Sequence, residues 1–320
     1  MSILDRWLGR SPVRRESDAP GPVLGGVALG PRPWLVLGGG GLRGMAHLGA
    51  WRALAEAGFE PTGILGTSIG ALVGACLAAD QPLDELDARA RELTRPNIAR
   101  IQRRVYWVGG IRNEAVFHSD ALEKYLAQLL PDGGWDAMAV RFQANAVELG
   151  SGRTEWFGVG ARIDVSLAEA VYASMALPVL YPPARLPGGC YVDGGVGDAL
   201  PLTRAAELGA TGIVAIDVGA GAEANARKIV ADGMVAIHQR VLSITTQRRR
   251  IETVEGWSGP PLLYIRPDLD GYGTFDFDHI PYFLEAGESA TRSRLGLTDP
   301  DPGAPEPKVD DAATAVQTRG

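Results

Sequence analysis

A serine stands at the centre of residues 66–70, which read Gly-Thr-Ser-Ile-Gly. A short apolar run precedes them and a helical pattern follows, so this G-x-S-x-G motif falls where a strand turns into a helix. That context is typical of a nucleophile elbow, in which Ser68 sits on a sharp turn and small residues at Gly66 and Gly70 prevent collisions. The alternative is a Gly-rich turn with a helix-capping serine. The strand–helix context favours the nucleophile.

A second group, residues 38–44, reads Gly-Gly-Gly-Gly-Leu-Arg-Gly between a strand and a helix. Consecutive glycines let backbone N–H groups point into one concavity, which suits a phosphate or a developing oxyanion. The spacing also satisfies G-x-G-x-x-G. However, the next strand ends in Gly-Thr-Ser rather than in the carboxylate of a dinucleotide site, and no Gly-Lys-Ser/Thr follows as in a P-loop.

A serine nucleophile needs a base. An α/β-hydrolase would use a later Asp and then a His, and His279, after Asp276 and Asp278, is the best histidine candidate. Residues 191–195, Tyr-Val-Asp-Gly-Gly, form a third group that by itself indicates only a turn.

Taken together, the three groups resemble the patatin-like phospholipases. Residues 39–44, 66–70 and 193–195 occur in the order and context of that family, as do residues 173–178, Ala-Ser-Met-Ala-Leu-Pro. The resemblance covers roughly residues 34–295 and is greatest to compact bacterial members related to the neuropathy-target-esterase branch.

The resemblance implies a serine lipid acyl hydrolase that needs neither metal nor organic cofactor. Its base would be Asp193, forming a Ser–Asp dyad with Ser68, and its oxyanion hole would be the backbone amides of Gly40 and Gly41. The expected substrate is a phospholipid, lysophospholipid or related ester. The supporting motif residues are Gly39, Arg43, Gly44, Gly66, Gly70, Gly194 and Gly195. A His279-dependent esterase and a non-catalytic regulatory protein that retains the motifs are the alternatives.

Two details of substrate binding remain open at this point. Arg43 could hold the glycine loop, attract a phosphate head group or form a structural ion pair. Four apolar residues could line an acyl groove or simply pack in the core: Met175, Leu177, Val179 and Leu180.

The elements that position these residues alternate along the chain. Apolar runs predict strands over residues 34–37, 64–66, 142–149, 213–218 and 262–265. Helical patterns cover residues 44–57, 68–79, 83–94, 119–129, 167–176 and 228–252. Such alternation predicts a mainly parallel sheet with helices on both faces. The family resemblance implies a three-layer α/β/α sandwich.

The amino-acid composition restricts the classes of protein to which this chain can belong. The 320 residues carry a net charge of −7, with 46% hydrophobic and 22% charged residues, which fits a globular protein and argues against a nucleic-acid binder. Two cysteines exclude a disulfide framework. We expect one catalytic domain over residues 33–298, between a mobile leader (1–32) and a disordered tail (299–320).

The sequence carries no secretory signal, and the uncharged stretch over residues 61–79 is better explained by a buried strand–turn–helix than by a membrane span. We therefore expect a cytoplasmic protein. From Arg95 to Arg112, five arginines and no acid alternate with apolar residues, which suits transient contact with an anionic membrane surface or, alternatively, a solvated helix and loop. The oligomeric state is left open.

Overall fold

The computed structural model describes residues 21–101, 113–219, 221 and 225–297. Its centre is an eight-stranded sheet in the order β10-β9-β3-β4-β5-β8-β7, with β6 also paired to β5. Strands β10 to β5 of this order run parallel, and β6, β7 and β8 are antiparallel to their neighbours. The strand bounds are β3 Pro33–Leu37, β4 Gly63–Gly66, β5 Arg141–Glu148, β6 Thr154–Gly158, β7 Ala184–Leu186, β8 Gly189–Asp193, β9 Gly212–Ile216 and β10 Leu262–Ile265.

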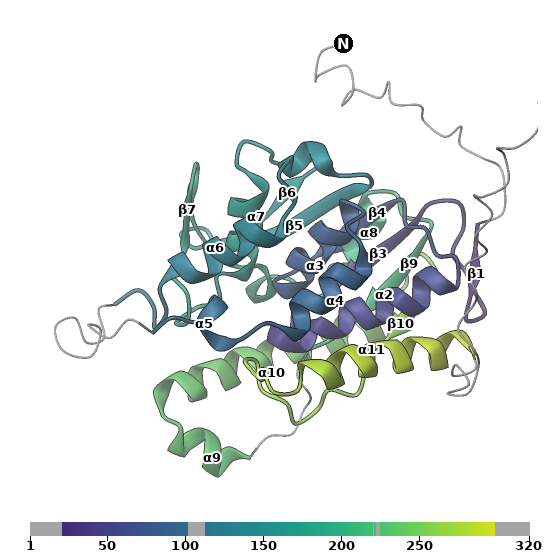
Figure 1. Ribbon diagram of the computed structural model, residues 1–320. Coiled ribbons are helices and arrows are strands. Elements are labelled where there is room, and N and C mark those ends of the chain that lie inside the picture. Colours follow the sequence, from purple (N-terminus) through teal and green to yellow (C-terminus); the bar gives the residue numbers. More distant parts are fainter. Residues whose placement is uncertain (1–20, 102–112, 220, 222–224, 298–320) are drawn as a thin grey trace, which may run out of the picture.

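Helices cover both faces of this sheet (Figure 1). Their bounds are α2 Ala46–Glu56, α3 Ile69–Ala78, α4 Leu83–Arg91, α5 Arg95–Ile98, α6 Ser119–Leu129, α7 Leu167–Met175, α8 Leu202–Glu207, α9 Ala226–Ala231, α10 Met234–Glu255 and α11 Ile280–Leu295. Because strand side chains alternate between faces, Leu35 and Leu37 of β3 join the core shared with α2, α3 and α11. Trp34 and Val36 join a second core with α8. The expected three-layer α/β/α sandwich is confirmed.

Strand pairing around β5 brings two distant segments together. Ala144 pairs with Gly66 of β4 and Ala146 pairs with Asp193 of β8. Both alanines also pair with β6, which therefore occupies the other edge of β5. Strands β4 and β8 therefore run toward each other along the same edge of β5. Their last residues pair with positions on β5 that are two residues apart. This register places the turn after β4 beside the carboxylate that ends β8.

Helices were predicted less well in the C-terminal third. The single helix expected over residues 228–252 is wrong, because Gly233, with φ +87°, separates α9 from α10. Helix α11 was not predicted at all. It packs on α2 with backbones in contact: a Cβ on Gly287 would lie 1.9 Å from the carbonyl oxygen of Ala46, and one on Gly49 would lie 1.8 Å from that of Leu284.

The N-terminal boundary also differs from the expectation. Residues 21–32, assigned to the leader, contain the hairpin β1 Val23–Leu24 and β2 Val27–Ala28. Leu29 is fully buried, and its carbonyl oxygen accepts a hydrogen bond of 2.9 Å from the hydroxyl of Thr211. The folded domain therefore begins before residue 33. The rest of the expected leader (1–20) and the expected tail (299–320) lie outside the described residues.

The apolar stretch over residues 61–79 forms strand β4, a turn and the buried helix α3, as predicted. Within the ranges that the structure describes, no helix combines the length and the apolar character needed to cross a membrane.

Candidate active site

Ser68 occupies the turn between β4 and α3 with φ +57° and ψ −124°, a backbone conformation that non-glycine residues rarely adopt. Its flanking glycines are sterically required. A Cβ on Gly66 would lie 2.2 Å from the carbonyl oxygen of Gly70, and a Cβ on Gly70 would lie 2.2 Å from that of Leu37. The sequence pattern therefore forms the strained elbow that it predicts.

The hydroxyl of Ser68 donates a hydrogen bond of 2.6 Å to Oδ2 of Asp193. The other carboxylate oxygen, Oδ1, accepts from the backbone N–H of Gly195 at 2.7 Å. Asp193 is only 3% exposed. Both carboxylate oxygens are therefore held, and one of them faces the serine oxygen at a distance suited to proton transfer.

Burial changes the acidity of this carboxyl. Desolvation raises the pKa of Asp193 to about 6, against the opposing effect of hydrogen bonds from Ser68 and Gly195. A carboxylate with this pKa is ionised at neutral pH and is a stronger base than an ordinary Asp.

The glycine loop presents unused donors beside this pair. The amides of Gly38 and Gly39 donate to the carbonyls of Ile216 and Ala199, each at 3.0 Å. In the part of the chain that the structure describes, the amides of Gly40 and Gly41 have no such protein acceptor, and both residues line the cavity at Ser68. Gly40 and Gly41 must be glycine, since a Cβ on either would lie within 2.5 Å of Val218 or Thr274. The loop can thus receive an anion.

Arg43 braces this loop. Its Nε donates to the carbonyl oxygen of Gly40 at 3.0 Å, and its Nη1 donates to that of Tyr272 at 3.2 Å. The Gly40 carbonyl belongs to the same planar peptide as the Gly41 N–H, so fixing one orients the other. Of the roles considered for Arg43, the loop-holding one matches these contacts.

Several supporting residues were not found by sequence reasoning. The fully buried hydroxyl of Ser174 on α7 accepts a hydrogen bond of 2.9 Å from the backbone N–H of Ser68. Asn145 donates to the carbonyl of Asp198 at 2.9 Å and lies against Gly194, where a Cβ would be 2.2 Å from its Oδ1. Ser174 lies within residues 173–178, a segment that shows the family resemblance, whereas Asn145 lies in the middle of a strand and has no recognisable sequence signal.

Gly44 and His47 support the glycine loop from the side of the first helix. A Cβ on Gly44 would lie 2.1 Å from the side chain of Ile69, so the glycine loop and the elbow can approach each other. The loop also contacts His47, whose Nε2 bonds to the carbonyl of Gly38 at 2.8 Å. Burial lowers the pKa of His47 to about 4, so the ring is neutral at pH 7.

His279 is not brought to Ser68. Its Nδ1 bonds to Oδ1 of Asp276 at 2.7 Å, its ring lies 4.8 Å from that of Tyr272, and its side chain is half exposed at the start of α11. It is not among the described residues that line the cavity containing Ser68. The carboxylate of Asp193 takes the position at the serine hydroxyl instead.

That cavity, of about 130 Å³, has the glycine loop and Ser68 on one side and largely apolar walls elsewhere. Met175 and Leu177 line it, which fits the acyl-groove alternative for these two residues, whereas Val179 and Leu180 are not among its described lining residues. One wall comes from α10 and was missed in the sequence. The α10 residues that line the cavity are Gln239, Leu242, Ser243, Thr246 and Arg250.

This chain is similar to several known proteins. A family model described as patatin-like phospholipase matches residues 35–206. Lysophospholipase nte1 of Aspergillus fumigatus is 27% identical over 344 aligned residues, which cover 97% of this chain and 21% of its own length. An uncharacterised NTE family protein of Mycobacterium tuberculosis is 34% identical over 195 residues, which cover 61% of this chain and 51% of its own length.

This chain therefore spans about a fifth of the fungal relative and about half of the mycobacterial one. Among solved structures, that of VipD from Legionella pneumophila matches with a TM-score of 0.49 and 16% identity, covering 89% of this chain and 72% of VipD. Since the family model covers more than half of the chain, this protein belongs to the patatin-like phospholipase family.

Proposed function

We propose that this protein is a carboxylic ester hydrolase that removes an acyl chain from a phospholipid, lysophospholipid or related lipid ester. The observation that carries the proposal is the 2.6 Å contact between the Ser68 hydroxyl and Asp193 at the wall of a largely apolar cavity. Membership of the patatin-like family and the lysophospholipase name of the fungal relative support the same substrate class.

In the acylation step, the oxygen of Ser68 attacks the ester carbonyl while its proton passes to Oδ2 of Asp193. The carbonyl oxygen becomes negatively charged and accepts hydrogen bonds from the backbone N–H groups of Gly40 and Gly41. An oxyanion donor of this kind is worth roughly 3–4 kcal/mol of barrier reduction. Arg43 acts as a positioning residue, because its bond to the Gly40 carbonyl keeps the next amide directed at the oxyanion.

Collapse of the tetrahedral intermediate breaks the bond to the leaving alcohol, which takes the proton from Asp193. Asp193 is then ionised again and accepts a proton from a water molecule that attacks the acyl-serine. The second collapse releases the fatty acid and returns the proton to Ser68. Each proton taken by Asp193 is returned within the same half-reaction, so the dyad cycles without a histidine.

A fluorophosphonate probe tests this proposal directly. We expect stoichiometric labelling of the native protein, with the adduct mapped by mass spectrometry to the peptide containing Ser68 and absent from Ser68→Ala. The same two proteins should differ in hydrolysis of p-nitrophenyl esters and lysophospholipids. Native protein that is folded but neither labelled nor active would instead support the non-catalytic alternative.

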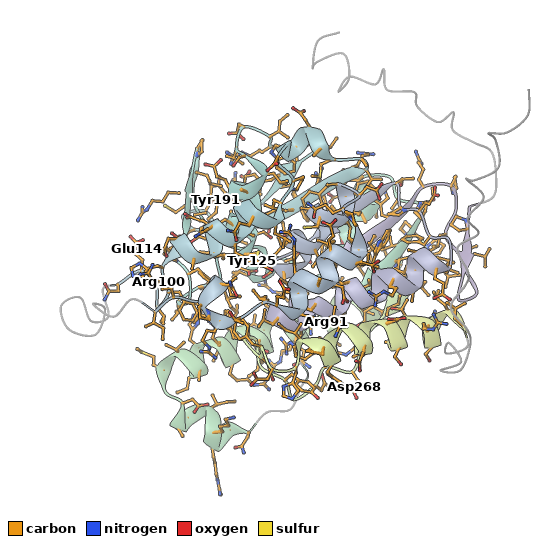
Figure 2. All side chains as sticks on the ribbon, in the orientation of Figure 1. Arg91, Arg100, Glu114, Tyr125, Tyr191 and Asp268 are labelled. Atoms are coloured by element: carbon orange, nitrogen blue, oxygen red, sulfur yellow. The ribbon has the colours of Figure 1, made fainter. Side chains whose placement is uncertain are left out.

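We further propose transient contact with an anionic membrane surface and a cytoplasmic location. Much of the Arg95–Arg112 segment lies outside the described residues; within it, Arg100 lies at one side of the molecule (Figure 2). Helix α10 adds an exposed apolar row, Met234, Ile237 and Val241, spaced for one helix face.

Liposome sedimentation tests the membrane contact. Replacing Arg103, Arg104 and Trp107 by Ala should lower binding to vesicles rich in anionic lipid by several-fold and leave binding to neutral vesicles unchanged, because each basic residue near such a surface contributes about 1 kcal/mol. The double variant Arg141→Ala, Arg153→Ala removes two exposed arginines beside β5 and β6 and serves as the charge-matched control. Equal binding of the triple variant and the native protein would refute a role for this segment.

A further inference from the structure

Helix α10 presents one polar face to the catalytic cavity. Gln239, Ser243, Thr246 and Arg250 recur at intervals of three and four residues, so they lie along one side of the helix. All four line the cavity that also contains Ser68 and the glycine loop. An acyl chain cannot form hydrogen bonds with these side chains, so this wall is suited to a polar part of the substrate.

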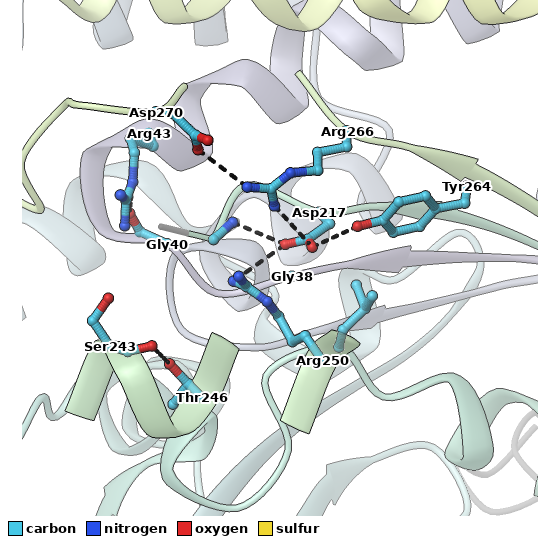
Figure 3. A network of polar contacts seen from close by, with 12 residues as sticks. Gly38, Gly40, Arg43, Asp217, Ser243, Thr246, Arg250, Tyr264, Arg266 and Asp270 are labelled. Carbon is cyan, nitrogen blue, oxygen red and sulfur yellow. Dashed lines mark hydrogen bonds and ion pairs between the residues drawn. The ribbon is translucent and has the colours of Figure 1, made fainter. Parts of the chain in front are cut away.

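The charges beside this wall do not balance. Arg250 is 5% exposed and pairs with Asp217 at 3.2 Å, while Asp217 also accepts from Tyr264 at 2.8 Å and from Arg266 at 3.2 Å (Figure 3). Arg266 pairs with Asp270 at 3.1 Å.

Arg43 is the third guanidinium of this group. It is 6% exposed, and its hydrogen bonds go to two neutral carbonyls rather than to a carboxylate. Its charged neighbours are Arg250, Asp217, Asp270 and Arg266, so three cations share two anions. Burial and the nearby Arg250 lower the pKa of Arg43 to about 10, which still leaves it charged at pH 7. Among the described residues that line the cavity, the catalytic Asp193 at Ser68 is the one anion, whereas the cations Arg43 and Arg250 gather beside the glycine loop and α10.

A hydroxyl group stands opposite these cations. The buried Oγ of Ser243 has no hydrogen-bond partner within the described structure, and in Figure 3 it points from α10 toward Gly40 and Arg43. Thr246, one turn further, donates to the carbonyl oxygen of Ser243 at 3.1 Å. A buried hydroxyl without a partner is costly unless a ligand supplies one.

We propose that Ser243, Arg250 and Arg43 form a subsite for the phosphate group of the lipid substrate, with Thr246 and Gln239 at its border. The inference rests on the proposed ester hydrolysis and deepens it, since it names the head-group chemistry that the site selects. A phosphate supplies both the negative charge and the acceptor oxygens that this wall lacks. Only a glycerol unit separates phosphate from scissile ester in such lipids, so one cavity has to hold both groups.

The test compares two water-soluble esters that differ only in the phosphate: hexanoylglycerol and hexanoyl-glycerol 3-phosphate. Both stay monomeric, so binding to a lipid surface plays no part. We expect the native enzyme to prefer the phosphate ester, mainly through a lower KM. The double variant Ser243→Ala, Thr246→Val should reduce the ratio of the two kcat/KM values by about tenfold, the size of effect expected for a hydrogen bond to a charged group.

Thr245→Val is the control, because Thr245 lies on the exposed side of α10 and, like Thr246, donates to a backbone carbonyl of the preceding turn, here that of Val241. Inorganic phosphate should raise the KM of the phosphate ester more than that of the neutral ester.

The possible failures are distinguishable. Equal turnover of the two esters by the native enzyme, or an unchanged ratio in the double variant, would overturn the subsite while leaving the esterase proposal in place. Inhibition of both esters to the same extent by inorganic phosphate would indicate a free-anion site and also overturn it. Hydrolysis of neither ester, by a protein that fails to react with the fluorophosphonate, would overturn the proposed function itself.

Discussion

Replacing Asp193 by Asn should lower kcat/KM for a p-nitrophenyl ester by about 10³-fold or more while leaving the fold intact. Asn has the same shape and keeps an oxygen for the Gly195 N–H, but its amide cannot accept the proton of Ser68. The loss should therefore appear in kcat, with little change in KM. Steady-state kinetics on protein whose fold is verified by circular dichroism gives the measurement.

His279→Ala is the matched control for this experiment. His279 bonds to Asp276 away from the serine, so its removal should change turnover by less than about twofold. A large loss in His279→Ala together with an active Asp193→Asn would reverse the assignment and favour a Ser–His–Asp hydrolase. The pair of variants thus separates the two mechanisms that the sequence alone allows.

The elbow at Ser68 could be predicted because its requirements are local. Gly66 is needed because a Cβ there would collide with the Gly70 carbonyl within five residues of chain, and Gly70 is needed because a Cβ there would collide with Leu37 of the neighbouring strand β3. Any sequence that makes this strained turn between a strand and a helix therefore needs the same glycine spacing. The hydrogen-bond partner of Ser68 could not be predicted from local sequence in this way. Asp193 is 125 positions away in the chain, and the residues around it indicate only a turn. It was assigned through resemblance to a family, not through local chemistry.

The structural reason for that contact lies in strand pairing. Strands β4 and β8 share an edge of β5, and their registers end at Ala144 and Ala146. Nothing in the local sequence of β5 specifies which strands pair with it, because a strand buried on both faces can accept many neighbours. The supporting role of Asn145, between those two alanines, was hidden for the same reason.

The predictions for the helices in the last third of the chain have two separate shortcomings. The one helix expected over residues 228–252 ignored Gly233, whose positive φ ends α9 and starts α10. Within α10, the described residues that line the cavity follow a helical spacing, but all of them except Leu242 are polar. Polar residues at helical spacing normally indicate a helix face exposed to solvent. This face of α10 lines the cavity only because of where α10 packs in the folded protein.

The activity should depend on pH through the ionisation of Asp193. Burial raises the pKa of this carboxyl from 3.8 to about 6, and only the ionised form can accept the serine proton. We therefore expect kcat/KM to be constant above about pH 7, to fall to half near pH 6 and to be about 100-fold lower at pH 4. A soluble p-nitrophenyl ester, assayed from pH 4 to 8 with corrections for product ionisation, gives the profile. A plateau extending below pH 5 would contradict it.

The same ionisation should cost stability. Between pH 3.8 and about 6 the folded protein binds more protons at Asp193 than the unfolded chain does, so this contribution to the free energy of unfolding is present at low pH and is lost as pH rises through 6. A shift from 3.8 to about 6 corresponds to roughly 3 kcal/mol. Asp193→Asn has no such charge, so its stability advantage over the native protein should grow by about 2 kcal/mol of this total between pH 4 and 7.5.

Urea unfolding of both proteins at the two pH values measures this difference. Asp198, whose pKa burial also raises, is present in both, so its contribution cancels in the comparison. If the advantage of Asp193→Asn did not change with pH, the carboxyl would not be desolvated in the folded state and the pH profile of the activity would need another titrating group. If the advantage grows as expected and the activity falls to half near pH 6, one buried carboxylate accounts for both results, and its cost in stability accompanies the gain in basicity that Ser68 requires.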